Sequence, residues 1–408
     1  MNPAVYILGG HQTDFAKVWS RHGEDLSDMV RVATEGALDA CGLDAAAIGS
    51  IHVGNAFGEL QRGQAHLGSM VAQVVPALWG VPAMRHEGAC ASSSLGILSA
   101  MAEIEAGRYD CALVLGVEEF KNVSGDIASQ NQNAAAWQGH EDIDCRFMWP
   151  AAFGLLAQEY ERRYGLDRRH LNRIAELNYA NARRNPLAQT RKWNFDAAAF
   201  TDDDVANPMI EPGTRRQDCG QITDGACAVV LASAAFARAH AERHGSSLEA
   251  LPRIAGWGHR NAGLRLRDKL ERSANAEYVF PHVRATIEDA WRRANVAGIE
   301  AMSGVETHDC FTTTEYMAID HLGLTPPGQS WQAVEDGRIE AGGACPVNMS
   351  GGLIGCGHPV GATGTRMLLD AARQVAGTAG DCQIDGAKRI QTLNIGGSCA
   401  TVVSFVVE

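Results

Sequence analysis

A histidine followed by proline stands inside an unusually glycine-rich stretch near the end of the chain. Residues 348–365 contain six glycines together with His358 and Pro359, and an apolar-periodic run begins directly afterwards. Glycine lets the backbone approach another segment or a ligand closely, and Pro359 restricts the conformation of His358 before it. We expect Thr363 or Thr365 to cap the following helix. The stretch predicts a rigid loop that presents one imidazole, although a tight turn with a partly exposed histidine fits the same pattern.

Cys90 is the first candidate partner for this histidine. It follows Gly88 and Ala89, and three serines and a predicted helix come after it. The thiolate is the reactive form of cysteine, and the partial positive charge of a helix N-terminus lowers a thiol's pKa. Small neighbours leave room for a ligand to reach the sulfur, so this position indicates a nucleophile. The alternative is a buried structural cysteine, which is the ordinary role of any single cysteine.

The composition is that of an ordinary globular protein. Its 408 residues are 46% hydrophobic, which allows a large core in two or three domains. The apolar runs are too short to cross a bilayer and the start of the chain lacks a signal-peptide pattern, so we expect a cytoplasmic protein without membrane insertion. A net charge of −13 argues against nucleic-acid binding, and a polyanionic ligand would need a local basic patch. The eleven cysteines lack zinc-site spacing, so we expect reduced thiols and no metal.

Strands and helices alternate in the first part of the chain. Strands are predicted over 4–9, 50–53 and 111–117, and helices over 26–41 and 95–106. Such alternation predicts an α/β fold with a largely parallel sheet.

The alternation of strands and helices stops between about residues 120 and 219. This region is polar and loop-rich, with helices predicted over 153–164 and 171–184. It carries a group of basic residues, which comprises Arg183, Arg184, Arg191, Lys192, Arg215 and Arg216. We interpret the region as an insertion that carries a binding surface, although solvated helix ends would look the same. The sheet pattern resumes at 222–231.

The second part of the chain repeats the plan of the first. The predicted elements are helices over 278–294 and 314–322 and strands over 304–307, 390–395 and 401–407. The loop after residue 53 corresponds to the loop after 307, and the Cys90 loop corresponds to the His358 loop. Two similar halves, 1–250 and 251–408, packed back to back would bring these loops together.

Several motifs together resemble the thiolase superfamily, in the family's order and over essentially the whole chain. They are Gly88-Ala89-Cys90-Ala91-Ser92-Ser93, Asp224-Gly225-Ala226, Asn348 with Ser350-Gly351-Gly352, Gly357-His358-Pro359 with Gly361-Ala362-Thr363-Gly364, and Thr392-Leu393-Asn394-Ile395-Gly396-Gly397. The resemblance implies a thiolase fold, with two repeated βαβαβαββ halves in a layered αβαβα arrangement and an inserted loop region that binds coenzyme A. Arg183, Arg184, Arg191 and Lys192 of that region are our candidates for contacts to coenzyme A.

The family's roles transfer to individual residues. Cys90 matches the nucleophile that takes up the acyl group, and His358 matches the histidine that activates it. The backbone amides of Cys90 and Gly396 match an oxyanion hole, in which preorganised donors face a developing negative charge.

Two departures from the classical thiolases refine the resemblance. Asn394 stands where those enzymes carry a second catalytic cysteine, and His308-Asp309-Cys310-Phe311 replaces Asn-Glu-Ala-Phe. The combination is similar to the sterol-carrier-protein-2 (SCP2) type of thiolase. That similarity assigns the second acid/base to Cys310 and a share of the first oxyanion hole to His308. Cys356, two residues from His358, is the rival for the acid/base role.

The resemblance implies cleavage of a 3-oxoacyl-CoA by CoA, or the reverse Claisen condensation, by a homodimer or homotetramer without a tightly bound cofactor. Three alternatives stay open. They are an acyltransferase or carbon-carbon lyase that acts with a small OB-fold partner, a cysteine hydrolase, and a non-catalytic acyl-CoA binding protein.

Overall fold

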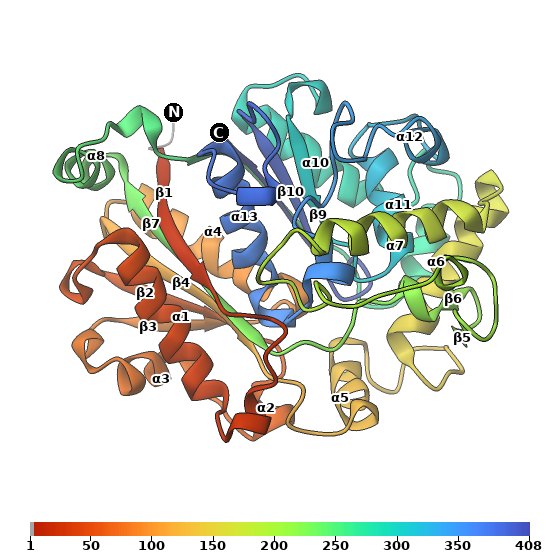
Figure 1. Cartoon of the computed structure of the whole chain (residues 1–408), viewed down its shortest axis with the longest axis horizontal. Coiled ribbons are helices and arrows are strands. Elements are labelled where there is room, and N and C mark those ends of the chain that lie inside the picture. Colours follow the sequence, from red (N-terminus) through yellow and green to blue (C-terminus); the bar gives the residue numbers. More distant parts are fainter. Residues whose placement is uncertain (1–3) are drawn as a thin grey trace.

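Nine strands form one mixed sheet in the computed structural model, which describes residues 4–408 (Figure 1). In chain order they are β1 (Val5–Gln12), β2 (Ser50–Gly54), β3 (Ala83–His86), β4 (Cys111–Glu118), β7 (Gly225–Ser233), β8 (Arg253–Asn261), β9 (Gly304–Thr307), β10 (Ile390–Gly396) and β11 (Thr401–Val407). Their order across the sheet is β3-β2-β4-β7-β1-β8-β11-β10-β9. Residues 4–408 include no helix that is long and apolar enough to cross a membrane.

The prediction of a largely parallel sheet is wrong. Only β2 with β3, β2 with β4, and β9 with β10 pair in parallel, and the other neighbours are antiparallel. The short link from β10 to β11 allows only an antiparallel pair, because a parallel pair needs a long crossover. Strand β8 was not predicted from the sequence, in which two glycines interrupt its apolar pattern.

The sheet consists of two similar parts that join weakly. Strands β1 and β8 pair through only two residues of each, Val5 with Ile254 and Tyr6 with Arg253. The first part follows the predicted βαβαβαββ order. In the second part, a single parallel bridge between Val305 and Val347 stands where the first part has β3.

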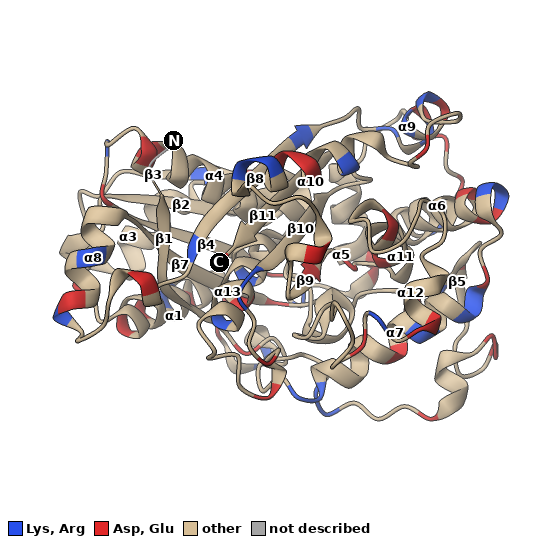
Figure 2. Cartoon of the chain, turned by 90° about the horizontal axis from the view of Figure 1, so that it is seen from above, with Lys and Arg blue, Asp and Glu red and all other residues tan. Residues whose placement is uncertain are grey.

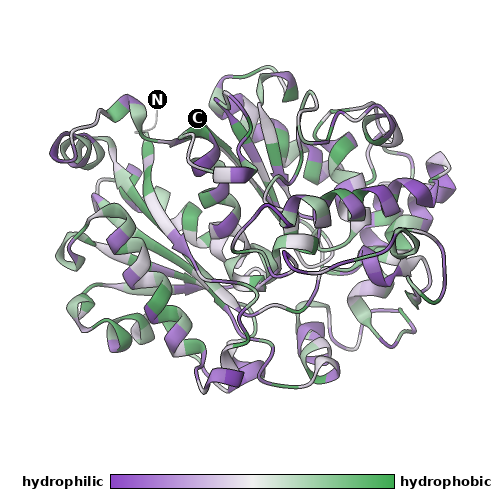
Figure 3. Cartoon of the chain, in the orientation of Figure 1, coloured by the Kyte–Doolittle hydropathy of each residue, from purple (hydrophilic) through white to green (hydrophobic). Residues whose placement is uncertain are grey.

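Helices cover both faces of each part, which confirms the predicted five layers. α1 (Leu26–Cys41) and α3 (Leu67–Val74) lie outside the first part, and α10 (Pro281–Ala294) lies outside the second with α11 (Thr312–His321) beside it. α4 (Ser92–Glu105) and α13 (Thr363–Val375) pack together between the two parts (Figure 1). Apolar residues occur on strands and helices alike (Figure 3), and charged residues lie mostly on the peripheral helices and loops (Figure 2).

The inserted region lies against the second half of the molecule. It contains α5 (Gly125–Gln132), α6 (Met148–Tyr164), α7 (Arg168–Ala182) and the hairpin of β5 (Met209–Glu211) and β6 (Thr214–Arg215). α6 begins five residues earlier than predicted, because Glu211 Oε1 accepts hydrogen bonds from the backbone N–H groups of Arg146 (2.9 Å) and Phe147 (2.7 Å). Such a cap from a distant residue leaves no local signal. The remaining helices are α2 (Gly58–Arg62), α8 (Ala234–Arg243), α9 (Leu266–Arg272) and α12 (Trp331–Glu335).

Candidate active site

Three loops from the two halves meet at a small cavity. The loops precede α4, follow β9 and precede α13, and they contribute Cys90, Cys310 and His358 to a cavity of about 80 Å³. The Cys90 sulfur and one ring nitrogen each of His308 and His358 lie within 4.8 Å of one another. Among residues 4–408, this is the one group of His, Cys and acidic side chains whose atoms are spaced to hold a metal ion.

Cys90 lies in a tight turn directly before α4. Ala89 has a φ of 51°, and its N–H donates to Glu87 Oε1 at 2.6 Å. Burial raises the pKa of the Cys90 thiol to about 12. A hydrogen bond from the backbone amide of Gly397 has the opposite, smaller effect on this pKa. The prediction that the helix N-terminus lowers this pKa is therefore wrong, because desolvation of the sulfur is the larger effect. The resting cysteine is a neutral thiol.

His358 has one nitrogen fixed and one nitrogen free. Its Nδ1 lies 2.7 Å from Thr363 Oγ1, and that hydroxyl donates to the Pro359 carbonyl at 3.3 Å. A hydroxyl has one proton to donate, so Thr363 accepts from Nδ1–H and Nε2 keeps its lone pair. Burial, with a smaller effect of the Arg366 charge, lowers the pKa of His358 to about 3, so the ring is a neutral base.

This contact also changes the role of the threonines. The N-cap residue of α13 is Ala362, which has no capping side chain, and the Thr365 N–H donates to Ser93 Oγ at 3.1 Å instead. The capping prediction for Thr363 and Thr365 is therefore wrong, because Thr363 binds the imidazole and Thr365 Oγ1 donates to the Ala362 carbonyl at 2.9 Å.

His308 is held in the opposite way. Ser94 Oγ donates to Asn394 Oδ1 at 2.7 Å, so the Asn394 amide directs its N–H toward His308 Nδ1 at 3.1 Å. Nδ1 must accept this bond, which places the ring proton on Nε2. Burial lowers the pKa of His308 well below its usual value, so the ring is a neutral donor. The two imidazoles stand edge to face, with centroids 5.3 Å apart.

The two candidate acid/base cysteines lie in different surroundings. Cys310 lines the cavity with Cys90, and its carbonyl accepts a hydrogen bond from the Gly220 N–H at 2.8 Å. Burial raises the pKa of the Cys310 thiol well above its usual value. Cys356 instead packs with Phe15, Ala182 and Ala188 and is not part of the cavity wall.

Two residues at this cavity received no firm role from the sequence: Gly397 was not singled out, and Trp149 belongs to an apolar run that fits either pocket lining or plain core. Gly397, one residue beyond Gly396, lines the cavity and directs its amide at the Cys90 sulfur, whereas Gly396 lines only the adjoining cavity. Trp149 forms another part of the wall and is anchored by a hydrogen bond from Nε1 to the Gln132 carbonyl at 3.1 Å. The apolar run at 147–149 was the available signal for Trp149.

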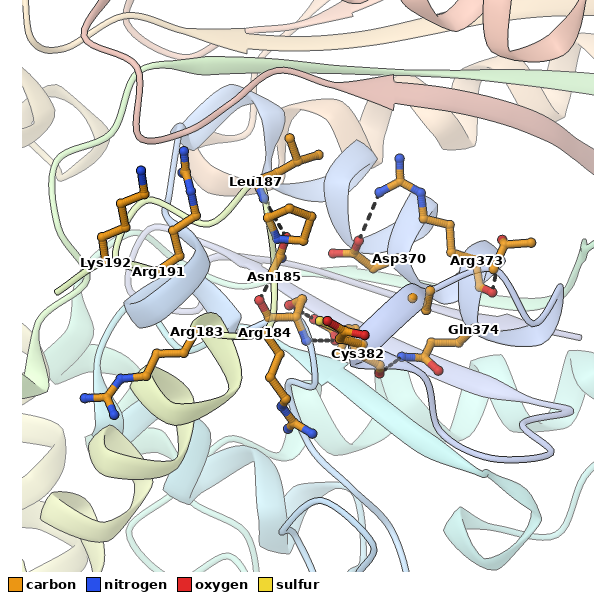
Figure 4. Close-up of a pocket in the computed structure, with 17 residues that line it drawn as sticks. Arg183, Arg184, Asn185, Leu187, Arg191, Lys192, Asp370, Arg373, Gln374 and Cys382 are labelled. Atoms are coloured by element: carbon orange, nitrogen blue, oxygen red, sulfur yellow. Dashed lines mark hydrogen bonds and ion pairs between the residues drawn. The ribbon is translucent and has the colours of Figure 1, made fainter. Parts of the chain in front are cut away.

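The four basic residues predicted to contact coenzyme A lie elsewhere. Arg183, Arg184, Arg191 and Lys192 line a separate cavity of about 750 Å³ (Figure 4), which shares no lining residue with the Cys90 cavity. The structure therefore does not bring these side chains into the group around the thiol.

Comparison with known proteins identifies the fold class. The family model described as "Thiolase, N-terminal domain" matches residues 5–195. The family model described as "Thiolase C-terminal domain-like" matches residues 267–408. The chain belongs to the thiolase family.

Particular relatives cover nearly the whole chain. An acetyl-CoA acetyltransferase of Methanothermobacter thermautotrophicus is 29% identical over 98% of both chains. Non-specific lipid-transfer protein-like 2 of Caenorhabditis elegans is 30% identical over 99% of this chain and 96% of its own length. Human sterol carrier protein 2 is 27% identical over 98% of this chain and 71% of its own.

A solved structure titled "Ltp2-ChsH2(DUF35) aldolase" has the same fold. It superposes with a TM-score of 0.78 at 17% identity, over 100% of this chain and 98% of its own.

Proposed function

We propose that this acyltransferase is a thiolase that cleaves a 3-oxoacyl-CoA with CoA, or catalyses the reverse condensation, through an acyl group on Cys90. The observation that carries the proposal is the group formed by one thiol and two neutral imidazoles, in which the free Nε2 carries a proton in His308 and a lone pair in His358. The relatives named acetyl-CoA acetyltransferase support the same general reaction.

His358 is the proposed base for the nucleophile. Because Cys90 and His358 are both neutral at rest, the thiol proton moves to His358 Nε2 as the sulfur attacks the 3-oxo carbon. His308 Nε2–H is placed to donate to an oxyanion. The amides of Cys90 and Gly396, with that of Gly397, are the proposed donors of a second oxyanion hole.

Cys310 is the proposed acid for the second half of the bond cleavage. When the bond between C2 and C3 of the substrate breaks, the electron pair stays on the enolate of acetyl-CoA, which takes a proton from the Cys310 thiol. The thiol of CoA then gives its proton to the Cys310 thiolate, and its sulfur attacks the acyl carbon on Cys90. The Cys90 sulfur leaves and takes its proton back from His358, which releases the shortened acyl-CoA. Both thiols are neutral again at the end of the turnover, in keeping with the buried site.

The test is CoA-dependent loss of the magnesium-enolate absorbance of acetoacetyl-CoA. Wild type should consume the substrate only when CoA is present, and Cys90→Ala and Cys310→Ala should not. Turnover without CoA that releases free acid would instead indicate a hydrolase.

A carbon-carbon lyase that works with a small partner protein is the second candidate. The observation that favours it is the structural neighbour, which is titled an aldolase in complex with a DUF35 protein. Copurification of a small protein, together with inactivity toward acetoacetyl-CoA by the isolated chain, would support this candidate over the first. We further propose that the thiolase acts as a homodimer or homotetramer, which size-exclusion chromatography with light scattering tests.

A further inference from the structure

A separate cavity, lined in part by Glu306 and Ser350, is not used by the proposed mechanism. It holds about 750 Å³ and lies between the segment after α7, the C-terminal end of α13 and residues 378–382. Figure 4 shows Arg191 and Lys192 on one side of it, Arg183 and Arg184 on another, and Arg373 opposite. The volume is within the range of pockets that hold small organic ligands.

The lining of this cavity is basic, although the whole chain carries a net charge of −13. Five cationic side chains face three acidic ones, which are Glu306, Asp370 and Asp381. Arg191 is paired with Asp14 at 2.8 Å, and Arg373 approaches Asp370 at 3.8 Å. Among residues 4–408, no ion pair involves Arg183, Arg184 or Lys192, so three cations are available to an anionic ligand.

A buried arginine behind the floor pairs with two of the three acids. Arg366 is 1% exposed, and its Nη1 lies 2.9 Å from Glu306 Oε2 and 3.0 Å from Asp370 Oδ2. Its Nε and Nη2 have no hydrogen-bond partner among residues 4–408. With Arg366 and Asp14 included, six cations stand against four acids, so the cavity keeps a positive balance of charge.

The geometry points to a second ligand site in this cavity, for a small molecule that carries two or more phosphate groups. Guanidinium groups bind phosphate oxygens in pairs, and lysine adds a mobile point charge. Because the cations stand on different sides of the cavity, one phosphate would engage only part of them. Pro186, Leu187 and Ala379 supply apolar surface in the same lining for an organic moiety such as a nucleoside.

A ligand bound in this cavity would contact residues close to the start of each loop that carries a histidine. Glu306 in β9 lies two residues before His308, and Ser350 opens the loop that leads to His358. Asn185, also in the lining, donates from Nδ2 to the Ser350 carbonyl at 2.9 Å. Ligand binding is therefore expected to change the rate at which Cys90 is acylated. This effect rests on the proposed function, whereas binding itself does not.

The first experiment is calorimetric titration of the full chain with ADP at low salt. Wild type should bind, and the double variant Arg183→Glu, Lys192→Glu should bind about tenfold more weakly or worse, because two attractive charges become repulsive. The matched control is Arg169→Glu, which reverses a charge on α7. The Arg169 side chain is 81% exposed and pairs only with Asp167. Absence of binding by wild type, or an equal loss in the control, would overturn the site.

Further titrations distinguish the source of the phosphate groups. Pyrophosphate should bind more weakly than ADP at the same site, because it lacks the organic moiety. If CoA displaces ADP, the cavity holds the phosphorylated end of CoA, and if both bind together, the ligand is a separate phosphorylated molecule. Either result supports the site, while ADP binding that survives the double variant would contradict it.

Discussion

The surroundings of His308 and His358 differ in one respect that decides their chemistry. Both rings are buried and neutral and stand edge to face, but an amide N–H meets His308 at Nδ1, whereas a hydroxyl oxygen meets His358 there. The free Nε2 is therefore a donor in His308 and an acceptor in His358. The comparison teaches that one chemical group serves two roles according to the atom behind it.

Removal of His358, whose Nε2 accepts the thiol proton, should have the largest effect on activity. His358→Gln leaves Cys90 without a base, so acylation of Cys90 by an acyl-CoA should slow by about 10³-fold, within the usual range for general-base catalysis. Mass spectrometry of the quenched protein measures this rate. His244→Gln, at the end of α8, is the matched control and should acylate like wild type. An unchanged rate in His358→Gln would mean that another group takes the proton.

Reversal of the hydrogen bond between Asn394 and His308 Nδ1 should have the next largest effect on activity. In Asn394→Asp the carboxylate accepts a hydrogen bond from Nδ1–H, so the neutral ring no longer carries its proton on Nε2. The value of kcat at pH 8 should then fall by about 10²-fold, the cost of one oxyanion donor. The new charge also raises the pKa of His308, so activity should recover as the pH falls and the doubly protonated ring donates again. Measurement of kcat against pH shows this slope.

A matched variant separates this effect from simple destabilisation. Gln391→Glu places a carboxyl group in the same strand at an equally buried amide, which contacts Trp291 and Ser404. It should lose stability without a pH-dependent recovery of kcat. Recovery in both variants, or in neither, would contradict the proposed tautomer of His308.

Loss of the hydroxyl behind His358 should have a smaller effect. Thr363→Val keeps the shape but removes the acceptor for Nδ1–H, and a lost hydrogen bond of about 1.4 kcal/mol corresponds to about tenfold in kcat. Thr365→Val is the control, since its hydroxyl donates to the Ala362 carbonyl and contacts the Cys227 thiol, and neither contact involves an imidazole. Equal losses in the two variants would show that helix packing, and not the imidazole, is responsible.

The pH profile of wild type should show the smallest change. The pKa of His358 is lowered to about 3, so the ring loses its proton below neutral pH, and the pKa of Cys90 is raised to about 12, so the thiol keeps its proton. Single-turnover acylation should therefore be level between about pH 5 and pH 9. A midpoint near pH 6.5 would indicate that His358 has an ordinary pKa and pairs with a Cys90 thiolate.

The sequence predicted much of the fold because its signals are local. α1 was predicted with its observed bounds, since Asp25 caps its start and Gly42 ends it in a left-handed conformation. The apolar run of β11 was equally clear, and β9 was also predicted with its observed bounds. The failures have non-local causes, namely the cap of α6 by Glu211 and the reduction of a strand to the single bridge at Val347.

The candidate site was predicted only as a set of residues. Motif order indicated that the Cys90, His308, Cys310 and His358 loops would meet, and in the structure these loops surround one cavity. The charge states could not be predicted, because burial of Cys90 outweighs its position before a helix. Of the six basic residues grouped from the sequence, Arg215 and Arg216 do not line the cavity of the other four, and that cavity is separate from that of the thiol. The six were assigned by the sign of their charge alone.

The most direct test of the two opposite histidines is nitrogen NMR of protein labelled with ¹⁵N at its histidine rings. The His358→Gln and His308→Gln variants assign the two rings. The account predicts a neutral His358 with its proton on Nδ1 and a neutral His308 with its proton on Nε2. The same tautomer in both rings, or a charged ring at neutral pH, would contradict it.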